Sequence, residues 1–250
     1  KKNFFYSSKK SNNLMHNNLY KDPKNSLTLF ELDDHLNFLS ELYLSNKLPK
    51  VLMLSGKKGI GKSTLVNHFL NFVYDKEKYN FKNKNINKDS YFNKQYTNNL
   101  FSNIIYLSAN NFKNIKIEDI RNLKSQLLKT TILDKERFIV LDDIELFNIN
   151  SLNALLKIIE EPTKNNYFIL INNKTKSLIE TIHSRSLELK IMLTNKKRLK
   201  IIKKLIDQNQ LEVFIDYATI DLTPGTFICF NDLLKVNEIK LEDDFLTNIE

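Results

Sequence analysis

Apolar positions along the chain fall into two alternating patterns. Short continuous apolar runs predict buried strands, and the segments between them carry apolar residues at every third or fourth position, as one face of a helix does. The strands are expected at 51–54, 104–108, 138–141, 167–171 and 187–192, and helices between them at 62–74, 117–129 and 151–160. Because strands that alternate with helices form parallel sheets covered on both faces, the pattern predicts an α/β fold.

Two stretches before residue 104 stand outside this alternation. Asp33 and Asp34 precede an apolar helical face that starts at Leu36, so we expect them to cap a helix that ends near Pro49. Residues 75–103 are rich in Asn and Lys and show no clear periodicity. We interpret them as a surface insertion with little fixed structure.

Beyond residue 192 the pattern becomes helical. Helices are expected at 195–207 and at about 210–217, followed by a break at Pro224. We therefore divide the chain into a larger α/β domain, residues 1–192, and a small all-α domain, residues 193–250. Since the sequence starts without Met and ends soon after a turn, we expect it to be part of a longer protein.

Composition and charge leave the partner open. The 250 residues are 42% apolar, enough for a sizeable core, and carry a formal net charge of +9. A basic chain suggests an acidic partner such as nucleic acid, but the Lys and Arg residues are scattered along the chain. The same charge would follow from an A+T-rich genome, whose codons favour Asn, Lys, Ile, Phe and Tyr. Both explanations stay open.

Cysteine and histidine usage argues against several kinds of site. Cys229 is the only cysteine, so no internal disulfide forms, and the four histidines lie far apart without metal-ligand spacing. We therefore expect no zinc site and a reducing, cytoplasmic location. No apolar run reaches the roughly 18 residues that a membrane span needs, so no membrane partner is expected.

The most informative motif lies between the first strand and its helix. Gly56 to Ser63 reads Gly-Lys-Lys-Gly-Ile-Gly-Lys-Ser and fits the phosphate loop, in which glycines let backbone N–H groups surround phosphate at a helix N-terminus. Lys62 would neutralise the β- and γ-phosphates of ATP, and Ser63 would bind Mg²⁺. A glycine turn formed by chance is the alternative. The expected nucleotide contacts are Gly56, Lys57, Lys58, Gly59, Ile60, Gly61, Lys62, Ser63 and Thr64.

An acidic pair ends the strand predicted at 138–141. Asp142 and Asp143 follow this apolar run as in a Walker B element, and Asp142 is expected to hold Mg²⁺ through water. Asp143 stands where AAA+ ATPases normally carry the Glu that polarises attacking water. Its side chain is one methylene shorter, and small misplacements are costly in such steps. Alternatively, the two aspartates cap the following turn.

Three further segments resemble the clamp-loader branch of AAA+ proteins. Residues 152–162, Leu-Asn-Ala-Leu-Leu-Lys-Ile-Ile-Glu-Glu-Pro, resemble that branch's NALLKxLEEP helix. Residues 168–173 resemble its sensor 1 strand, which implies that Asn173 contacts the γ-phosphate or the attacking water; an ordinary strand-end Asn is the alternative. Residues 181–186 resemble its Ser-Arg-Cys element, with Ser in place of Cys. This implies that Arg185 enters the ATP site of a neighbouring subunit; an ordinary surface charge is the alternative.

Narrower features resemble the delta-prime type of subunit. Residues 48–56, Leu-Pro-Lys-Val-Leu-Met-Leu-Ser-Gly, and residues 117–121, Ile-Glu-Asp-Ile-Arg, match phrases of that type, and the resemblance runs from Leu27 to Gly225. Two features depart from it. Residues 75–103 lack the four-cysteine zinc module of many relatives, and no sensor 2 arginine lies beside Gly225.

The resemblance implies an AAA+ P-loop NTPase domain followed by an all-α lid, cut short of a C-terminal collar domain. It implies a chain that binds ATP and Mg²⁺, hydrolyses ATP poorly and supplies Arg185 in trans to a motor subunit. The implied partners are tau/gamma and delta subunits in a hetero-pentamer, a sliding clamp, and primer-template DNA reached through the complex. Three alternatives stay open: a hydrolysing tau/gamma-type motor subunit, a non-enzymatic scaffold with a remnant P-loop, and an unrelated P-loop NTPase.

Overall fold

The computed structural model describes residues 23–109, 115–128, 135–163 and 165–237. Within these ranges five strands form one parallel sheet in the order β2-β3-β4-β1-β5. The strands are β1 (Val51–Ser55), β2 (Ile104–Ser108), β3 (Arg137–Asp142), β4 (Asn166–Asn172) and β5 (Leu187–Lys190). The strands predicted from the apolar runs and their parallel arrangement are therefore confirmed.

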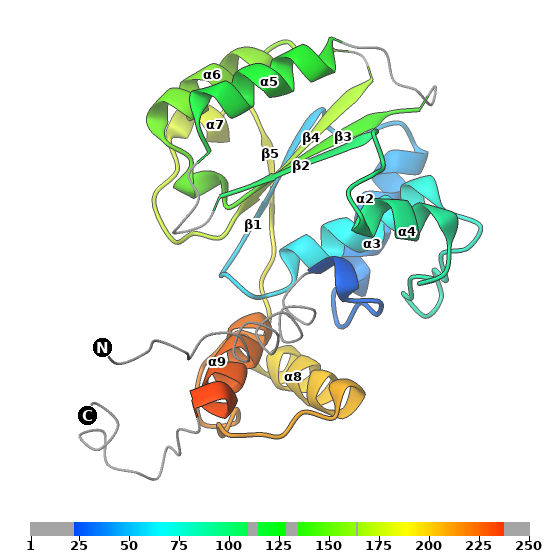
Figure 1. Ribbon diagram of the computed structural model, residues 1–250, viewed down its shortest axis with the longest axis vertical. Coiled ribbons are helices and arrows are strands. Elements are labelled where there is room, and N and C mark those ends of the chain that lie inside the picture. Colours follow the sequence, from blue (N-terminus) through cyan, green and yellow to red (C-terminus); the bar gives the residue numbers. More distant parts are fainter. Residues whose placement is uncertain (1–22, 110–114, 129–134, 164, 238–250) are drawn as a thin grey trace, which may run out of the picture.

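Helices cover both faces of this sheet (Figure 1). They are α2 (Asp33–Leu44), α3 (Lys62–Tyr74) and α4 (Tyr91–Thr97) on one face, and α5 (Ile117–Leu127), α6 (Ile149–Ile159) and α7 (Glu180–His183) on the other. Successive residues of a strand point to opposite faces. In β3, Phe138 and Val140 join the core beside α3, whereas Ile139 and Leu141 join the core beside α5 and α6. The predicted covering of both faces is confirmed.

The strand register brings the carboxyl ends of the strands together. Ser55 of β1 lies beside Asn172 of β4, and Ser108 of β2 lies beside Asp142 of β3. The loops that follow β1, β3 and β4 therefore leave the sheet at the same edge. In open α/β sheets, ligands bind at this edge.

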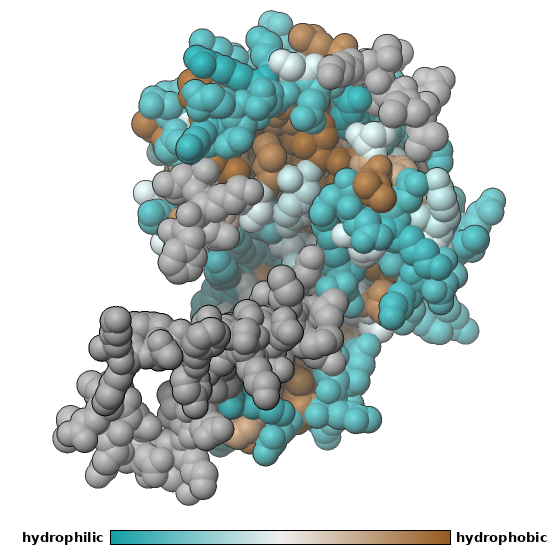
Figure 2. Space-filling model, in the orientation of Figure 1, coloured by the Kyte–Doolittle hydropathy of each residue, from teal (hydrophilic) through white to brown (hydrophobic). Residues whose placement is uncertain are grey.

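β2 forms an edge of the sheet and is less covered than the central strands. All five of its residues are half-buried, whereas β1 and β3 are buried throughout. Figure 2 shows hydrophobic side chains gathered between α4 and α5, on a face that is otherwise mostly hydrophilic. The helices thus cover the middle of the sheet more fully than this edge.

The first long helix, α2, starts differently from the prediction. Its N-cap is Leu32, which makes no side-chain capping hydrogen bond. Capping by Asp33 and Asp34 is therefore wrong. Both aspartates lie inside the first turn, where a negative charge interacts favourably with the positive end of the helix dipole. Leu36 and Leu39 are buried, as expected for the apolar face.

The prediction that residues 75–103 have little fixed structure is wrong. This segment contains α4 and short bridges in which Asn85 pairs with Thr28 and with Asn80. Four of its apolar side chains belong to the core that also contains α3, namely Tyr79, Ile86, Phe92 and Tyr96. Each enters the core from a turn or from one short helix, so no repeating apolar face marks the segment in the sequence.

His68 of α3 ties this segment to the chain before α2. Its Nε2 donates to the carbonyl of Ser26, and its Nδ1 accepts from the hydroxyl of Tyr79, both at 3.0 Å. Because a carbonyl oxygen only accepts, the bond to Ser26 assigns the ring proton to Nε2. Burial lowers the pKa of His68 to about 4, so the ring is neutral in the folded protein at neutral pH.

Two helices, α8 (Asn195–Asn209) and α9 (Pro224–Asn237), pack together after the sheet. Their shared core contains Ile202, Ile215, Phe227 and Leu234. Figure 1 shows this pair beyond the end of β5, away from α5, α6 and α7. We call α8 and α9 the C-terminal helical pair. The domain boundary at residue 192 stays a prediction.

Two expectations for this region are wrong. Residues 210–217 form no helix: Gln210 has a left-handed φ of 49°, which ends α8, and Asn231 of α9 bonds the N–H of Phe214 and the carbonyl of Glu212. The chain that follows is held by buried Arg198, which donates to the carbonyls of Tyr217, Ile220 and Leu222. Pro224 starts α9 rather than breaking a helix. Proline fits the first helical position because the N–H that it lacks has no partner there.

Replacement of Phe92 tests the packing of the 75–103 segment. Phe92 is 5% exposed, and its ring stacks with those of Tyr74 and Tyr96. Phe92→Ala should lower the free energy of unfolding by about 3 to 5 kcal/mol, because it removes a large buried side chain and leaves a cavity. Tyr91→Ala is the control, since Tyr91 is 74% exposed. Denaturant titrations followed by circular dichroism measure both, and equal effects would contradict the packing.

The pKa of His68 predicts a pH dependence of stability. Between pH 6.5, the ordinary value, and about 4, the unfolded chain binds a proton that the folded chain does not, so stability falls as pH falls through this window. The loss should approach roughly 3 kcal/mol near pH 4. In His68→Gln, whose side chain does not titrate, this loss of unfolding free energy at low pH should be missing. Urea titrations of both proteins at pH 7 and pH 4.5 check it; a constant difference in unfolding free energy would contradict the assignment.

Candidate functional site

The loop between β1 and α3 adopts a backbone that its glycines allow. Gly59 has a φ of 82° and Gly61 a φ of 98°, both in the region that side chains disfavour. Gly61 is also the N-cap of α3, so the loop runs directly into the positive end of that helix. The order of strand, loop and helix that a phosphate loop requires is therefore present.

Lys62 places a buried cation in this loop. Its side-chain ammonium donates to the carbonyls of Gly56 and Lys57, both at 2.8 Å, and the residue is 2% exposed. Burial lowers the pKa of Lys62 to about 8. Among the residues that the structure describes, no carboxylate lies within ion-pair distance of it. The carboxylates of Asp142, Glu145 and Asp143 act on this charge only from beyond ion-pair distance, so the site still fits a closer anion such as phosphate.

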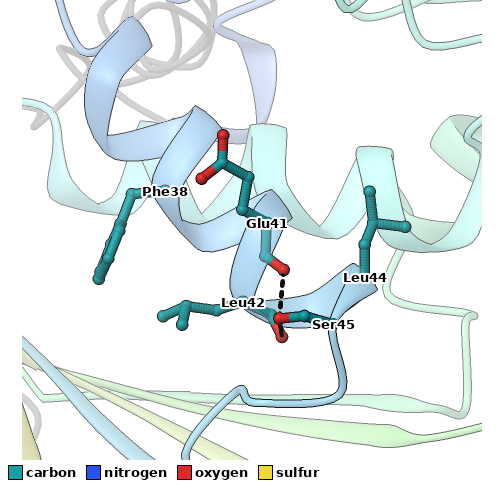
Figure 3. Close-up of a pocket in the computed structure, with 5 residues that line it drawn as sticks. All are labelled: Phe38, Glu41, Leu42, Leu44 and Ser45. Carbon is teal, nitrogen blue, oxygen red and sulfur yellow. Dashed lines mark hydrogen bonds between the residues drawn. The ribbon is translucent and has the colours of Figure 1, made fainter.

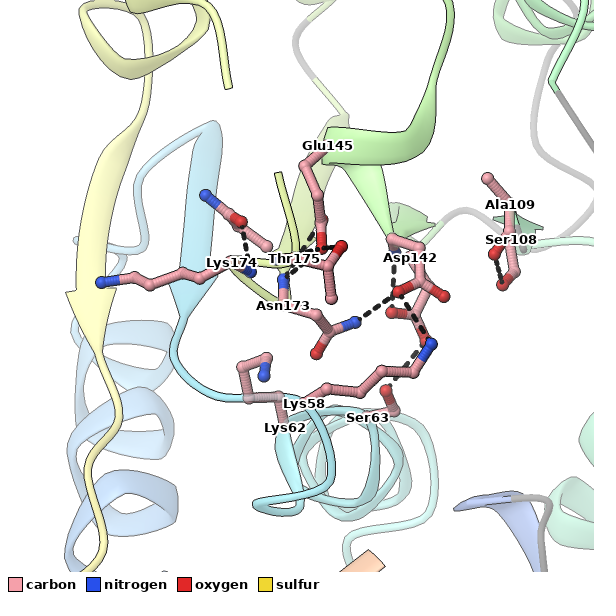
Figure 4. Close-up of polar contacts among 12 residues, drawn as sticks. Lys58, Lys62, Ser63, Ser108, Ala109, Asp142, Glu145, Asn173, Lys174 and Thr175 are labelled. Carbon is pink, nitrogen blue, oxygen red and sulfur yellow. Dashed lines mark hydrogen bonds and ion pairs between the residues drawn. The ribbon is translucent and has the colours of Figure 1, made fainter. Parts of the chain in front are cut away.

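Asp142, at the end of β3, is surrounded by hydrogen-bond donors (Figure 4). Its Oδ2 accepts from the Ser63 hydroxyl at 2.9 Å and from the Tyr106 hydroxyl, and its Oδ1 accepts from the N–H of Asp143 at 2.9 Å. Burial raises the pKa of this carboxyl group. The adjoining hydroxyl and carboxylate oxygens of Ser63 and Asp142 fit a hard cation such as Mg²⁺.

Asn173, which follows β4, contacts Asp143, which follows β3. Asn173 Nδ2 donates to Asp143 Oδ1 at 2.8 Å, and Lys58 Nζ lies 3.5 Å from the same oxygen. Neither Asp142 nor Asp143 caps the turn that follows with its side chain. The capping alternative is therefore wrong, and the structure brings the residues of the predicted acidic and sensor motifs into direct contact.

Sequence reasoning missed Glu145 and Tyr106. Glu145 is 5% exposed and accepts from the backbone N–H groups of Asn173 and Thr175 and from the Thr175 hydroxyl, so it holds the chain that carries Asn173. Glu145 lies two residues after Asp143, and this spacing does not predict a contact with the residues that follow β4. Tyr106 could have been noticed as the only side chain with a polar group in the apolar part of β2.

These residues face a cavity of about 1030 Å³. It is lined by parts of 23–32, the phosphate loop, α4 and the C-terminal helical pair. The predicted site residues along it are Lys58, Gly59, Ile60, Gly61, Lys62, Ser63, Thr64, Asp142, Asp143 and Asn173. Gly56 and Lys57 are not part of the lining, because their carbonyls accept from Lys62 and the Lys57 side chain lies 3.5 Å from Asp221.

The C-terminal helical pair touches the phosphate loop directly. The N–H of Gly225 donates to the carbonyl of Gly59 at 2.8 Å, and the Thr223 hydroxyl donates to the carbonyl of Lys58 at 2.7 Å. A Cβ added at Gly225 would lie 3.0 Å from Gly59 Cα, so this close approach depends on glycine. The N-terminus of α9 thus forms one wall of the cavity without contributing an arginine.

Arg185 lies apart from this cavity. It follows α7 and contacts Glu160, Thr181 and Ser184, none of which lines the cavity. Figure 1 shows α7 beside α6, on the face of the sheet opposite α3. Arg185 therefore does not act on a ligand held by its own phosphate loop in this structure.

A second cavity, of about 550 Å³, lies on α2 (Figure 3). Its lining is Phe38, Glu41, Leu42, Leu44 and Ser45. It contains no cluster of titratable groups. Across the described part of the chain, no three His, Cys, Asp or Glu side chains are placed to share a metal ion, and no described helix has the length and apolar character to cross a membrane.

Comparisons with known proteins agree with this geometry. The family described as DNA polymerase III, delta subunit, matches residues 32–195. The DNA polymerase III subunit delta' of Buchnera aphidicola subsp. Baizongia pistaciae is 34% identical over 79 residues, which are 32% of this chain and 24% of that protein. The DNA polymerase III subunit tau of Bacillus subtilis is 24% identical over 179 residues, 70% of this chain and 30% of that protein. The chain thus matches less than a third of each relative's length.

Solved structures show the same fold. The Aeropyrum pernix ORC1 protein in complex with DNA is 15% identical, with a TM-score of 0.51, and the match covers 77% of this chain and 53% of that chain. At this level of identity the likeness concerns the fold alone. The fold is that of the AAA+ P-loop proteins, as expected from the motifs.

The contact between Gly225 and Gly59 predicts an unusual effect of alanine. In the first turn of an ordinary helix, Gly→Ala stabilises by up to about 1 kcal/mol. Here Gly225→Ala should instead lower the free energy of unfolding by roughly 1 to 3 kcal/mol, because the added Cβ would meet the Gly59 backbone. Hydrogen exchange of peptides covering 56–63 and 223–228 should speed up together. A stabilised variant with unchanged exchange would contradict this contact.

Proposed function

Because the chain belongs to the family described as DNA polymerase III, delta subunit, we propose that it is a delta-prime-like clamp-loader subunit of a bacterial replicative polymerase. In this role it helps to load a sliding clamp onto primer-template DNA, as one subunit of a hetero-pentamer with tau/gamma and delta subunits. The observation that carries the proposal is the family match over 32–195, the range that contains the phosphate loop, the acidic pair, Asn173 and Arg185. A cytoplasmic location follows from this role.

The chain's own site is proposed to bind ATP and Mg²⁺. Lys62 supplies a buried cation for the β- and γ-phosphates, and the loop supplies N–H groups at the N-terminus of α3. Ser63 and Asp142 supply oxygen ligands for Mg²⁺, which neutralises phosphate charge when bound. The cavity of about 1030 Å³ offers room for the nucleotide.

Turnover at this site is proposed to be inefficient. Asp143 is shorter than the usual Glu, and its carboxylate is engaged by Asn173 and Lys58. The N-terminus of α9, where a sensor 2 arginine is expected in relatives, presents Pro224, Gly225 and Thr226 to the cavity. Both features remove groups that would align water or stabilise charge on the transferred phosphate.

Arg185 is proposed to act in trans, on the ATP of the adjacent motor subunit. Its place just after α7, which covers the face opposite α3, and its lack of contact with its own cavity support this role. A guanidinium suits it because the group stays charged and can grip phosphate oxygens with two N–H groups.

A hydrolysing motor subunit of the tau/gamma type is the second candidate. The match to the tau subunit of Bacillus subtilis, over 70% of this chain, favours it. In a motor subunit, ATP turnover depends on the chain's own phosphate loop. In the delta-prime role, it depends on Arg185. The two candidates therefore differ in which of two residues matters for turnover.

Arg185→Ala and Lys62→Ala separate these candidates in a complex of the full-length protein with its cognate partners. Arg185→Ala should lower DNA- and clamp-stimulated ATPase by about tenfold or more, because such arginines contribute on the order of 10³ to 10⁵ in rate in GTPases. Lys62→Ala should have little effect, since this site turns over slowly. The reverse pattern would identify a motor subunit, and loss of assembly in Arg185→Ala would mark a structural arginine.

A further inference from the structure

The Glu-Glu-Pro sequence that follows α6 has a contact that its helix does not explain. Glu160 is the C-cap residue of α6, and its Oε1 accepts from Nε of Arg185 at 2.9 Å and lies 2.7 Å from an Nη of the same guanidinium. The two residues are 25 positions apart in the sequence. The end of the NALLK-like helix thus meets the arginine of the Ser-Arg element.

This ion pair contributes little to the stability of the fold. The side chains of Arg185 and Glu160 are 35% and 46% exposed, and ion pairs with such exposure are weak because water screens both charges. Glu160 also stands at the negative end of the α6 dipole, where a carboxylate is unfavourable. Neither helix stability nor burial explains a glutamate at this position, so its contact with Arg185 needs another reason.

The contact sets the direction of the guanidinium. Glu160 occupies the Nε edge, while the opposite Nη1 donates to the Thr181 carbonyl at 3.1 Å and to the Ser184 hydroxyl at 3.3 Å. The bonds at Nη1 are the longer ones and the easier to exchange. Glu160 takes Nε and one N–H of Nη2, so the edge that can grip phosphate is formed by the second N–H of Nη2 and the N–H groups of Nη1.

We propose that Glu160 is a positioning residue for Arg185, holding the guanidinium in the orientation in which it enters a neighbouring subunit's ATP site. This rests on the proposed function of Arg185 in trans. A free arginine side chain has many rotamers, and fixing it in advance removes the entropy cost of ordering it when the subunits meet. Since a small misplacement of a group that acts on the transition state is costly, the loss should appear in kcat.

The test uses the complex reconstituted from the full-length protein and its cognate partners, with DNA and clamp. Glu160→Ala should lower kcat for ATP about tenfold and leave KM for ATP unchanged, because the arginine is retained but no longer oriented. Glu160→Gln, whose amide oxygen still accepts from Nε, should recover most of the loss. Glu161→Ala is the matched control, since it removes a neighbouring exposed carboxylate of the same charge and should leave kcat unchanged.

A double variant tests the link between the two residues. In the Arg185→Ala background, Glu160→Ala should cause no further loss, because the residue it positions is absent. If Arg185→Ala lowers turnover but Glu160→Ala does not, the positioning role is wrong and the trans role of Arg185 stands. If Arg185→Ala has no effect, the proposed function itself fails.

Two further outcomes overturn the inference. A rise in kcat in Glu160→Ala would mean that Glu160 withholds the arginine instead of orienting it. Equal losses of kcat in Glu160→Ala and Glu161→Ala would mean that the effect comes from surface charge and not from the contact with Arg185. Gel filtration of each complex verifies assembly. If Glu160→Ala alone fails to assemble, the positioning role is tested by comparing the kcat of Glu160→Gln with those of the wild type and of Arg185→Lys. A Glu160→Gln complex with a kcat as low as that of Arg185→Lys would refute the role.

Discussion

The burial of the Lys62 ammonium is the constraint on which the site depends. A cation that is almost wholly removed from water must be hydrogen-bonded, and here two backbone carbonyls of the loop supply the bonds. The loop that leads from these carbonyls to Lys62 turns through Gly59 and Gly61, both of which have left-handed φ angles. Gly61 is also the N-cap of α3, so the loop ends at the positive end of that helix. The buried ammonium and the helix N-terminus therefore both favour an anion at this loop.

The other parts of the site are organised around this loop by parallel pairing. β1 lies between β4 and β5, and β3 pairs with β4, so the ends of three strands meet at one edge. Ser63 reaches Asp142 from the loop side, and Asn173 reaches Asp143 from β4. Glu145 then holds the backbone of Asn173, so the position of the sensor side chain depends on a third acidic residue after β3. None of these contacts could form if the register of β3 against β4 were shifted by one residue.

Much of this arrangement could be predicted because its signals are local. A few consecutive residues are enough to identify each of three features: the strands of continuous apolar residues, the glycine-rich loop and the acidic end of β3. The 75–103 segment could not be predicted, because Phe92 and Tyr96 reach the core from a single short helix without a repeating face. Pro224 was misjudged for a similar reason, since the sequence around a proline does not show whether a helix ends there or begins. The partners of Arg198 lie about twenty residues away, beyond the range of local pattern.

The phosphate loop and Arg185 lie in different parts of the molecule. At the carboxyl edge of the sheet, Asp142 and Asp143 are hydrogen-bonded by the protein's own donors, and Gly225 packs against the phosphate loop, so this site is already well satisfied internally. Arg185, which follows α7, is half-exposed. Glu160 holds its Nε side, and only neutral oxygens hold Nη1. A site whose carboxylates are engaged favours holding a nucleotide over attacking it, while an oriented, exposed guanidinium favours action on a ligand that belongs to another chain. Under the proposed function, the chain keeps an intact phosphate loop and acts mainly through Arg185, a residue outside it.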